Sequence, residues 1–514
     1  MTSPSASRPA LLGIDLGTSS VKAVVTELGG ELLAHASASY PVVHDHPGWA
    51  ETDPLRWLSA TIVAVRQVLD SVRVDIRAVG LSGQMHGLVP ADVLGKPVRS
   101  AMLWSDSRAV GRLGAYHQLP SQLGVRLANP LTPGMAGPML AWLRDNEPET
   151  YRRSRWALRP KDWLCAQLTG QIWSEPSDAS ATLLYDVAAD RWDSDIVGAL
   201  KLDSRLLPEL LASAGSCAGQ LTAVGADLLN LPTGVPVAAG AADTAAAALG
   251  SGLTVGTAQL TIGSGAQVVT PYASLPSRPH GQPPVTHLYR AATSRGWYGM
   301  GAVANAGLDL DRVRSVPGAS WAELYAAASL PPHKDDPYFL PHLQGERTPY
   351  LDPDMRGAWV RLSPRHDRSR LLRAALEGVA FSIADAVHAL LAESPVDHLR
   401  LAGGGSTHPV WRQLLADVLA LPLRAVNVSA ASGRGAALLG AQAAGLMTEH
   451  EVLARLISTT ELVASPAIRA CRLLRATQQQ LPRDRPRAAA GRSLIASRTH
   501  RTPRRHHERE HVIP

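Results

Sequence analysis

The chain of 514 residues is 45% hydrophobic and 18% charged, which is typical of a folded globular protein and excludes bulk disorder and collagen-like repeats. Its net charge of +6 comes from residues 476–514, where nine arginines face three acidic residues, while the remaining 475 residues carry 41 basic and 41 acidic side chains. The body of the protein is therefore neutral, and we expect no electrostatic binding site for nucleic acid or for an anionic membrane.

The first predicted element is a β meander. An apolar strand over 10–15 ends in Asp15, the small residues 17–20 (Gly-Thr-Ser-Ser) follow, and strands over 21–26 and 31–38 complete it. Small residues let backbone N–H groups approach anionic oxygens, and a carboxylate at a strand end can organise Mg²⁺. The segment therefore indicates a phosphate site, although an Asp that only opens a tight turn would give the same pattern.

A second polar segment follows a predicted strand over 78–81. Residues 83–87 read Gly-Gln-Met-His-Gly, and strand ends are where α/β sheets usually bind ligands. His86 could contact a ligand. The alternative is a structural histidine that hydrogen-bonds only to neighbouring protein groups. We interpret the segment as a candidate ligand-binding loop.

Asp243 comes after an apolar strand over 235–239 and a loop of small residues, and it opens an Ala-rich helix over 244–249. Aspartate is a good helix N-cap, so capping alone would account for it. It is also the one charged residue between Asp227 and Arg278, at a point where the two halves of the chain should meet. A catalytic role and a capping role both remain open.

The first hairpin has a counterpart in the second half of the chain. A strand over 257–262, small residues over 263–266 (Gly-Ser-Gly-Ala) and a strand over 267–270 repeat its pattern, and two such loops could clamp one polyphosphate. A third small-residue loop, 403–406 (Gly-Gly-Gly-Ser), precedes a predicted helix over 409–419. Its glycines leave room for an adenine or a ribose, unless the loop is a simple strand-to-helix turn.

The order of the elements predicts an α/β fold with mixed sheets. Amphipathic helices are expected between the strands, over 55–69, 138–144 and 368–391. The repeated hairpin predicts two domains, 10–248 and 254–470, separated by a short Gly- and Ser-containing break. The Arg- and Pro-rich composition of residues 476–514 predicts a disordered basic tail.

The cysteines and the apolar segments indicate the compartment. Three cysteines lie far apart with no CxxC pair, which predicts neither a disulfide framework nor a metal cluster. The N-terminus lacks the apolar stretch of a secretory signal, and the uncharged run 244–284 is too weakly apolar to span a bilayer. We therefore expect a cytoplasmic protein of the size of an enzyme.

Five separated segments together resemble the FGGY family of carbohydrate kinases in content and in order. They are 13–22 (GIDLGTSSVK), 47–54 (PGWAETDP), 83–87 (GQMHG), 240–243 (GAAD) and 403–405 (GGG) with the helix that follows. Supporting matches are 103–108 (LWSDSR), 160–162 (PKD), 345–349 (GERTP) and 377–381 (EGVAF). Each segment alone is modest, whereas the ordered set is specific and covers about residues 10–470.

The resemblance implies two actin-like domains of the ribonuclease-H type with a catalytic cleft between them, and ATP-dependent phosphorylation of a sugar. It further implies that Asp243 is the general base and that Asp15 is an essential catalytic residue that holds Mg²⁺ through water. The Met85–His86 pair matches the place where family members that act on D-xylulose contact this sugar, so the implied product is D-xylulose 5-phosphate. D-ribulose, L-ribulose, glycerol and a catalytically silent sensor are the alternatives.

The resemblance also divides the remaining site residues between two ligands. The sugar side has Gln84, Met85, His86 and Trp104. The ATP side has Gly17, Thr18, Ser19, Gly263, Ser264, Gly403 and Gly404. The implied cofactors are ATP and Mg²⁺, and the implied partners are a ketopentose and ATP, with no nucleic acid and no membrane; a homodimer is compatible with the sequence.

Three positions depart from the family pattern. Thr244 stands where Asn is common, Met139 stands where Lys is usual, and residues 263–266 read Gly-Ser-Gly-Ala rather than Gly-Thr-Ser-Gly. None of these changes removes the implied base, and each bears on affinity. The segment 476–514 does not resemble the C-terminus of the family.

Overall fold

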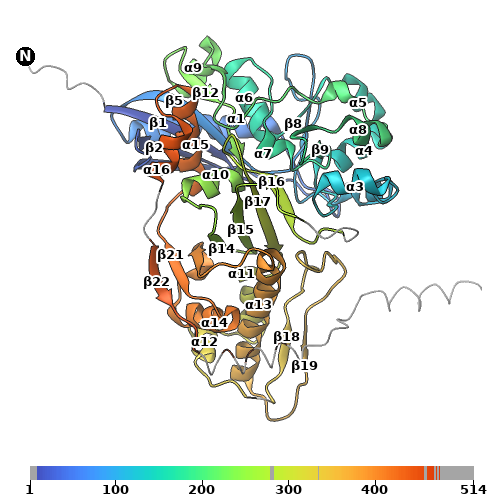
Figure 1. Cartoon of the computed structure of the whole chain (residues 1–514), viewed down its shortest axis with the longest axis vertical. Helices are drawn as coiled ribbons and strands as arrows, with labels where there is room; N and C mark the ends of the chain where they lie inside the picture. The colour runs from blue at the N-terminus through green and yellow to red at the C-terminus, as the bar shows by residue number, and fades with distance from the viewer. Residues whose placement is uncertain are drawn as a thin grey trace, which may run out of the picture.

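The computed structural model describes residues 8–277, 283–333, 335–456 and 460–467, together with Cys471, Leu474 and Gln478. They form two domains, one around the strands that begin the chain and one around the strands of its second half (Figure 1). Each domain is built on a seven-stranded mixed sheet with helices packed against it. The predicted α/β class is confirmed.

The N-terminal sheet has the strand order β11-β12-β5-β1-β2-β3, with β13 beside β5. Its strands are β1 (Arg8–Leu16), β2 (Ser20–Glu27), β3 (Leu32–Ser39), β5 (Val74–Gly83), β11 (Cys217–Gln220), β12 (Pro236–Ala238) and β13 (Ala241–Ala242). The first three strands are the predicted meander and pair antiparallel. Strands β1, β12 and β13 are parallel to β5, so their carboxyl ends lie at one edge of the sheet.

Ten helices with bounds in the N-terminal half accompany this sheet among the described residues. They are α1 (Pro54–Asp70), α2 (Leu113–His117), α3 (Ser121–Leu127), α4 (Ala136–Asn146), α5 (Pro148–Arg153), α6 (Pro160–Thr169), α7 (Pro176–Ala179), α8 (Ser194–Ala199), α9 (Ala223–Leu229) and α10 (Asp243–Gly250). Helix α1 buries Trp57 against Trp163 of α6, with ring centroids 6.1 Å apart. Met139 of α4, one of the positions that depart from the pattern expected from the resemblance, is fully buried in an apolar cluster.

The C-terminal sheet has the order β16-β17-β15-β14-β20-β21-β22. Its strands are β14 (Ala258–Ile262), β15 (Ala266–Tyr272), β16 (His287–Arg290), β17 (Trp297–Val303), β20 (Leu399–Ala402), β21 (Leu423–Val426) and β22 (Thr460–Ala464). From β17 to β22, its pairs are parallel and antiparallel in the same succession as those from β3 to β11. The duplication predicted from the two hairpins thus extends to six strands of each sheet.

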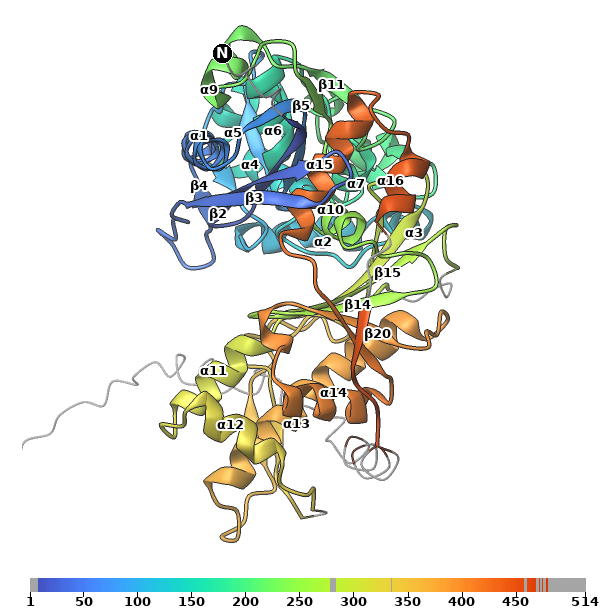
Figure 2. The ribbon, with the colours of Figure 1, turned by 90° about the vertical axis from the view of Figure 1, so that its left-hand side faces the viewer.

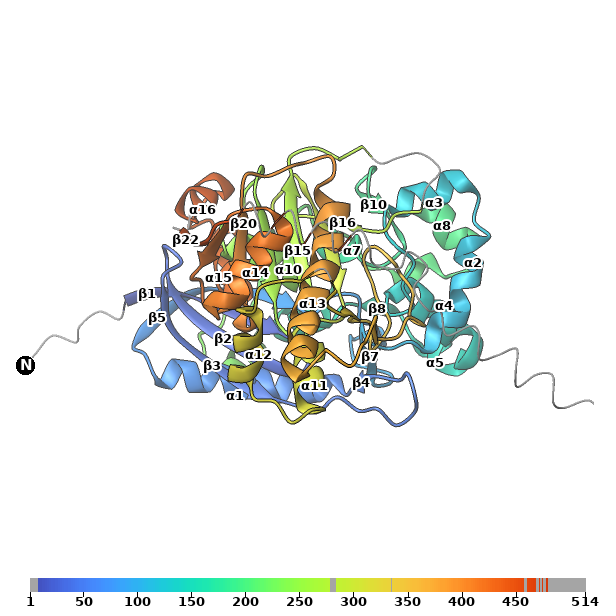
Figure 3. The same ribbon diagram turned by 90° about the horizontal axis from the view of Figure 1, so that it is seen from below.

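Six helices and several short strands complete the described fold. The helices are α11 (Gly307–Ser315), α12 (Trp321–Ala328), α13 (Arg368–Leu391), α14 (Pro409–Leu419), α15 (Ala431–Ala443) and α16 (Glu449–Arg455). The short strands are β4 (Glu51–Thr52), β6 (Val89–Ala91), β7 (Ala101–Met102), β8 (Trp156–Leu158), β9 (Tyr185–Asp186), β10 (Arg191–Trp192), β18 (Tyr338–Leu340) and β19 (Ala358–Val360). Helices α11 to α14 lie on the side of the C-terminal sheet that faces away from the N-terminal domain (Figures 1 and 3).

Helix α15 departs from the division read off the sequence. It lies within the predicted segment 254–470 but packs against β1, β5 and α10 of the N-terminal domain (Figure 2). Glycines make this contact: a Cβ on Gly80 would lie 1.7 Å from Ala436 O, and one on Gly13 would lie 1.9 Å from Gly433 O. The chain therefore crosses between the domains before and after α15 and α16, as well as after α10.

One helix within the described residues, α13, is long and apolar enough to cross a membrane by length and composition alone, and 83% of its most apolar stretch is buried inside the C-terminal domain. That burial is typical of a core helix. The predicted tail, 476–514, lies outside the described residues except for Gln478, whose side-chain amide donates to Asp385 Oδ1 at 3.0 Å.

Candidate active site

Two aspartates from distant parts of the chain meet at the carboxyl edge of the N-terminal sheet. Strands β1 and β13 flank β5, and Ser82 of β5 is paired with both Asp15 and Ala241. Asp243 follows β13 immediately and begins α10. The parallel pairing therefore brings Asp15 and Asp243, separated by more than 200 residues, to the two sides of one strand end.

Asp15 is held by its neighbours on both strands. Ser82 Oγ donates to Asp15 Oδ1 at 3.0 Å, and Lys22 is its antiparallel partner on β2. Burial raises the pKa of Asp15 above its usual range, while the Ser82 hydrogen bond and the Lys22 charge act in the opposite direction. The carboxyl group is half-buried, so solvent or a ligand can reach it.

Asp243 is the first helical residue of α10, and the N-cap is Ala242. Its Oδ1 accepts from the Thr244 backbone N at 2.5 Å and from the Thr244 hydroxyl at 3.1 Å. Burial raises the pKa of Asp243 to about 7, with the charge of Asp15 acting in the same direction. A carboxyl group poised near neutral pH is suited to accept a proton from an alcohol.

The first small-residue loop, 17–19, connects β1 to β2 at the same edge. Gly17 O accepts from Gln84 Nε2 at 3.2 Å and from the Tyr40 hydroxyl, which together fix the start of the loop. Ser19 is exposed and Thr18 half-buried. Gln84 itself is only 1% exposed, so the structure places this predicted sugar-binding residue beneath the loop 17–19, for which the sequence predicts phosphate binding.

Trp104 reaches the same loop from another segment. Its Nε1 donates to Thr18 Oγ1 at 2.9 Å, so the indole ring lies beside residues predicted to hold phosphate. Trp104 and Asp106 belong to one short connection after β7, and Asp106 Oδ2 accepts from Ala50 N at 2.7 Å. The position of Trp104 therefore depends on how firmly Asp106 is held.

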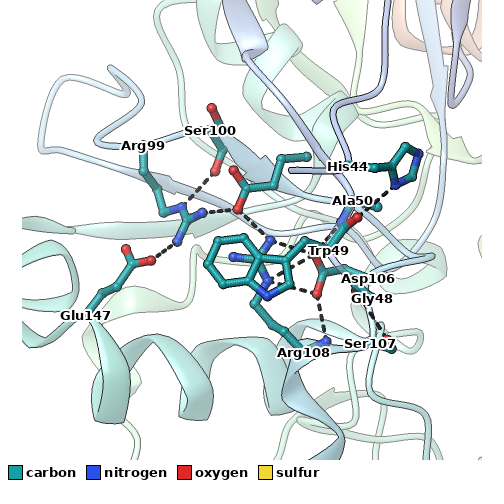
Figure 4. A network of polar contacts seen from close by, with 11 residues as sticks. His44, Gly48, Trp49, Ala50, Arg99, Ser100, Asp106, Ser107, Arg108 and Glu147 are labelled. Carbon is teal, nitrogen blue, oxygen red and sulfur yellow. Dashed lines mark hydrogen bonds and ion pairs between the residues drawn. The ribbon is translucent and has the colours of Figure 1, made fainter. Parts of the chain in front are cut away.

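A buried ion network holds that connection (Figure 4). The Arg108 guanidinium binds Asp106 at 2.7 Å and Glu51 at 2.5 Å, and its carbon lies 3.4 Å from the centre of the Trp49 ring. Arg99 bridges Glu51 to Glu147 on the other side. The network ties the segment around Trp49, predicted only as a family match, to the loop that presents Trp104.

His86 and Met85 lie where the two domains touch. His86 has a left-handed backbone (φ 72°), and its Nδ1 lies 2.8 Å from Ala181 O. Met85 is 5% exposed, and its sulfur accepts from the Tyr298 hydroxyl of β17 at 3.7 Å. The ring of Tyr289 on β16 has its centre 5.9 Å from that of His86. The predicted sugar segment thus faces the C-terminal sheet.

The protonation of His86 follows from its contacts. Burial lowers the pKa of His86 to about 4, and the charge of Arg347 acts in the same direction. The ring is therefore neutral at pH 7. Since a carbonyl oxygen only accepts, Nδ1 carries the proton that Ala181 O receives, and Nε2 keeps a lone pair that can accept a hydroxyl hydrogen.

The second and third small-residue loops also share one sheet edge. Strands β14 and β20 are parallel neighbours with Thr261 opposite Ala402, so residues 263–265 and 403–405 leave the sheet side by side. A Cβ on Gly403 (φ 89°) would lie 2.3 Å from Ile262 O, a contact that only glycine permits. Gly263, Ser264, Gly403 and Gly404 are all exposed, as a loop that receives a nucleotide requires.

The structure thus gathers the predicted site residues into two clusters. One holds Asp15, Gly17, Thr18, Ser19, Gln84, Met85, His86, Trp104 and Asp243, and the other holds Gly263, Ser264, Gly403 and Gly404. Within the described residues, no hydrogen bond or ion pair joins the loop 17–19 to either loop of the second cluster. No group of three or more His, Cys, Asp or Glu side chains in that part of the chain is placed to hold a metal ion.

Sequence reasoning missed a buried charge cluster beneath the first cluster. Lys161 is fully buried with its Nζ 2.6 Å from Asp162, 3.3 Å from Glu175 and 3.3 Å from Asp178. Ser177 Oγ donates to Glu175 and accepts from Ala242 N at 3.0 Å, directly before Asp243. The only signal was the family match at 160–162, which carried no assigned role.

A second missed residue is Arg347, which contacts the N-terminal domain from the C-terminal one. Its guanidinium carbon lies 5.0 Å from the centre of the Trp104 ring. The match at 345–349 marked this segment in the sequence, but nothing local indicated that its arginine would reach a residue more than 240 positions away.

Comparison with known proteins covers both clusters. The N-terminal domain model of the FGGY family of carbohydrate kinases matches residues 10–250, and the C-terminal domain model of the same family matches residues 253–444. A xylulose kinase of Lactococcus lactis subsp. lactis (strain IL1403) is 34% identical over 461 residues, which is 87% of this chain and 90% of the relative. A xylulose kinase of Escherichia coli (strain K12) is 34% identical over 414 residues, 79% and 84% of the two chains.

A solved structure gives the same result in three dimensions. The crystal structure of a xyloylose kinase from Brucella ovis superposes with a TM-score of 0.85 at 30% identity, and covers 95% of this chain and 100% of that one. The fold of two actin-like domains is therefore shared along nearly the whole chain.

Proposed function

Because the chain belongs to the FGGY family of carbohydrate kinases, we propose that it transfers the γ-phosphoryl group of ATP to O5 of D-xylulose and releases D-xylulose 5-phosphate and ADP. One observation supports the proposal most directly: Asp243, Asp15 and the loop 17–19 lie together at one edge of the N-terminal sheet. The pKa of Asp243 is raised there to about 7. The named xylulose kinases among its relatives support the choice of sugar.

The proposed chemistry is an in-line displacement that Asp243 assists. As O5 attacks the γ-phosphorus, the O5–H proton passes to the Asp243 carboxylate, the new O5–P bond forms, and the bond from the γ-phosphorus to the β–γ bridging oxygen breaks so that ADP leaves. A protein that only sensed sugar and nucleotide would have no use for a base at this place. The sensor alternative is therefore disfavoured.

His86 supports a hydroxyl-rich acceptor on the sugar side. Its neutral ring offers Nε2 as an acceptor for a sugar hydroxyl. Trp104, whose indole N–H donates to Thr18, would supply an apolar face to the same ligand. We propose that Met85 shapes the pocket by packing and that Gln84 acts through the loop 17–19 rather than by touching the sugar.

The nucleotide is proposed to bridge the two clusters when the domains approach. The loops at 17–19 and 263–265 would hold the phosphates, and the loop at 403–405 the adenosine, in a cleft that excludes water as a competing acceptor. The predicted domains, 10–248 and 254–470, would be the two sides of that cleft.

The residues present fit a magnesium ion that arrives with ATP. The charge of Asp15 raises the pKa of Asp243, so the two carboxyl groups form a site that attracts a cation. Mg²⁺ usually takes one or two carboxylates together with phosphate oxygens and waters, so Asp15, through water, would be the protein's contribution. The ion would neutralise phosphate charge when bound. A cytoplasmic location, where ATP is available, belongs to the same proposal.

A coupled assay of ADP release with MgATP tests the substrate. The panel is D-xylulose, D-ribulose, L-ribulose and glycerol, with ³¹P NMR to identify the product. We expect D-xylulose to give the highest kcat/KM. A tenfold advantage for glycerol or L-ribulose, about 1.4 kcal/mol of transition-state preference, would overturn the proposed sugar. ADP release without a sugar phosphate would overturn the transfer itself.

A further inference from the structure

Arg347 places a charged guanidinium group, without a hydrogen-bonded or ion-paired partner among the described residues, at the junction of the two domains. Its side chain is open to solvent and, within the described residues, makes no hydrogen bond and no ion pair. The protein atoms beside the guanidinium lower the pKa of Arg347, the charge of Glu346 acts in the opposite direction, and the side chain stays charged at neutral pH. A charged side chain in such a place is available for a ligand.

The loop that carries Arg347 is held rigidly by the residue before it. The Glu346 carboxylate accepts from the backbone N of Ala304 at 2.8 Å, from Asn305 Nδ2 at 3.1 Å and from Ser382 Oγ at 3.1 Å. Thr348 N donates to Ala302 O at 2.9 Å on the other side. Because its two neighbours are anchored, Arg347 projects from a fixed base and does not belong to a mobile loop tip.

The groups around Arg347 are those already placed on the sugar side. The guanidinium lies over Trp104, and burial together with the guanidinium charge lowers the pKa of His86. Tyr289 lies near His86 and near Arg347. None of these three side chains is a carboxylate. The Glu346 carboxylate also acts on Arg347 by its charge, but its oxygens accept from Ala304 N, Asn305 Nδ2 and Ser382 Oγ. Within the described residues the five N–H donors of Arg347 have no hydrogen-bond acceptor, and they lie beside Trp104, on the side where the sugar is proposed to bind.

The chemistry of the reaction leaves one oxygen on the sugar that needs a donor. O5 must be a free hydroxyl to accept phosphate, but in the furanose form of D-xylulose O5 is bonded to C2. The reacting form is therefore the open chain, in which C2 is a carbonyl. A carbonyl oxygen only accepts, so neutral His86, which offers an acceptor at Nε2, cannot serve it.

We propose that Arg347 donates to the C2 carbonyl oxygen of the open-chain ketose and thereby selects ketoses over polyols with the same carbon skeleton. The inference rests on the proposed function and assigns a specificity role to a residue of the C-terminal domain. Because His86 and Trp104 belong to the other domain, the carbonyl is bound fully only when Arg347 and these residues face the sugar together.

The test compares D-xylulose with xylitol, in which the C2 carbonyl is a hydroxyl, using the wild-type chain, R347Q and R347K. We expect R347Q to lower the ratio of kcat/KM for D-xylulose to that for xylitol by about ten- to a hundredfold, as for the loss of a charge-assisted hydrogen bond. R347K keeps the charge but not the planar fork, so it should lie between. Should xylitol turnover be too slow to measure, its competitive inhibition constant replaces kcat/KM: that constant should stay unchanged in R347Q while the Kd for D-xylulose rises.

A matched control is R365Q, which removes an exposed arginine from the connection that precedes α13 and should leave the ratio at the wild-type value. Melting temperatures of all variants should differ little, because within the described residues the Arg347 side chain makes no hydrogen bond or ion pair and its ring contact is with Trp104 alone. An equal loss with both substrates would overturn the inference in favour of a phosphate or structural role, and an unchanged R347Q would overturn it outright. Failure of the wild-type chain to phosphorylate any ketopentose would instead overturn the proposed function.

Discussion

Asp243 lies at the start of a helix and beside a second carboxylate, Asp15. These two features have opposite effects on its pKa. The helix start favours a negative charge, whereas burial and Asp15 disfavour it and raise the pKa of Asp243 to about 7. The net effect is a carboxyl group, the proposed base, that is half-ionised near neutral pH. Such a group is unfavourable for stability and useful for catalysis.

The Asp243→Asn variant separates the catalytic role from a local structural one. Asparagine keeps an oxygen for the Thr244 N–H but cannot take a proton, so we expect kcat to fall by about two to four orders of magnitude. The measurement is kcat with D-xylulose and MgATP beside a thermal melt of the same preparation. A near-normal rate would show that the residue is structural. Thr244→Asn, which introduces the residue expected from the family resemblance, is the neighbouring control and should stay active.

The pH dependence of wild type and Asp243→Asn gives a second, independent check. Asp243 must be ionised to act, so kcat/KM should rise through about pH 7 and fall about tenfold per unit below it. A profile that is flat from pH 5.5 to 8 would contradict the assignment.

The ionisation of Asp243 also makes the stability of the fold depend on pH, and the raised pKa determines the direction of that dependence. The folded-state pKa of Asp243 lies above its usual value of 3.8, so between about pH 4 and pH 7 the folded protein holds a proton that the unfolded chain has lost. Stability from this group is present at low pH and is lost as the pH rises through that window. Asp243→Asn should therefore melt higher than wild type at pH 8, with the difference vanishing near pH 4.

At the scale of elements, α15 is positioned by glycines on both sides of its contact. Gly80 lies on β5, one strand away from the meander that carries Asp15, and a methyl group there would overlap Ala436 O of α15. The helix backbone thus packs directly on the strand that separates Asp15 from Asp243, the two aspartates that we propose to be catalytic. Any displacement of α15 is transmitted to the site.

Gly80→Ala should accordingly destabilise the N-terminal domain. Since backbone must move to admit the methyl group, we expect a loss of at least ~2–3 kcal/mol in the free energy of unfolding, measured in urea. Gly124→Ala on α3 is the matched control, because nothing lies within 4 Å of the position of its new Cβ and its φ is ordinary, so it should be neutral or slightly stabilising. Equal melting of the two variants would contradict the packing described here.

The buried cluster around Lys161 also positions elements of the N-terminal domain, in this case through charge. Burial alone would lower the pKa of Lys161, but the charges of Asp162, Glu175 and Asp178 raise it, so the lysine stays charged. Removing that charge with Lys161→Met leaves three carboxylates around a buried gap. We expect a loss of ~3–5 kcal/mol in unfolding free energy and a lower kcat, because Glu175 and Ser177 support the residue before Asp243.

The control for Lys161→Met is Lys96→Met, at an exposed side chain in the turn that follows β6. It should leave both unfolding free energy and kcat within error of wild type. Were Lys161→Met to recover as a stable, fully active protein, the carboxylates would have to be protonated in the fold. Lys161→Arg, which keeps the charge, should be the milder of the two substitutions if charge rather than shape decides.

At the scale of the whole molecule, each of the two sheets supplies one half of the proposed site. The N-terminal sheet edge carries the aspartates and His86, while the C-terminal sheet edge carries the exposed loops at 263–265 and 403–405 and, nearby, Arg347. No residue of either cluster lies beyond 405. The basic tail is therefore expected to be dispensable for transfer.

A chain that ends at residue 480 tests this expectation, because it keeps the contact of Gln478 with Asp385 and removes all nine tail arginines. We expect kcat/KM for D-xylulose to stay within twofold of the full-length value. The same pair of proteins should show any affinity for nucleic acid only in the full-length chain and only at low salt. A large fall in kcat/KM would assign the tail a part in the site.

Local pattern alone determined the strands, the small-residue loops and the two aspartates. The apolar runs before Asp15 and Asp243, and the glycines that follow or precede them, are short-range signals, so the element bounds agree with those predicted to within a few residues. The pattern could not distinguish an N-cap from the first helical residue at Asp243. That distinction depends on the pairing of Ala242 with Gly83 on β5.

Only the tertiary structure decided which side chains meet. The sequence predicts that Gln84, at a strand end, contacts the sugar, yet its amide donates to Gly17 O. Conversely, no local sequence pattern around Arg347 indicates that its side chain contacts Trp104. Helix α15 follows the C-terminal strands in sequence but packs on the N-terminal sheet. The physical reason is the same in each case: parallel pairing and domain contact join residues far apart in the chain, and their energy comes from close packing that no short window of sequence contains.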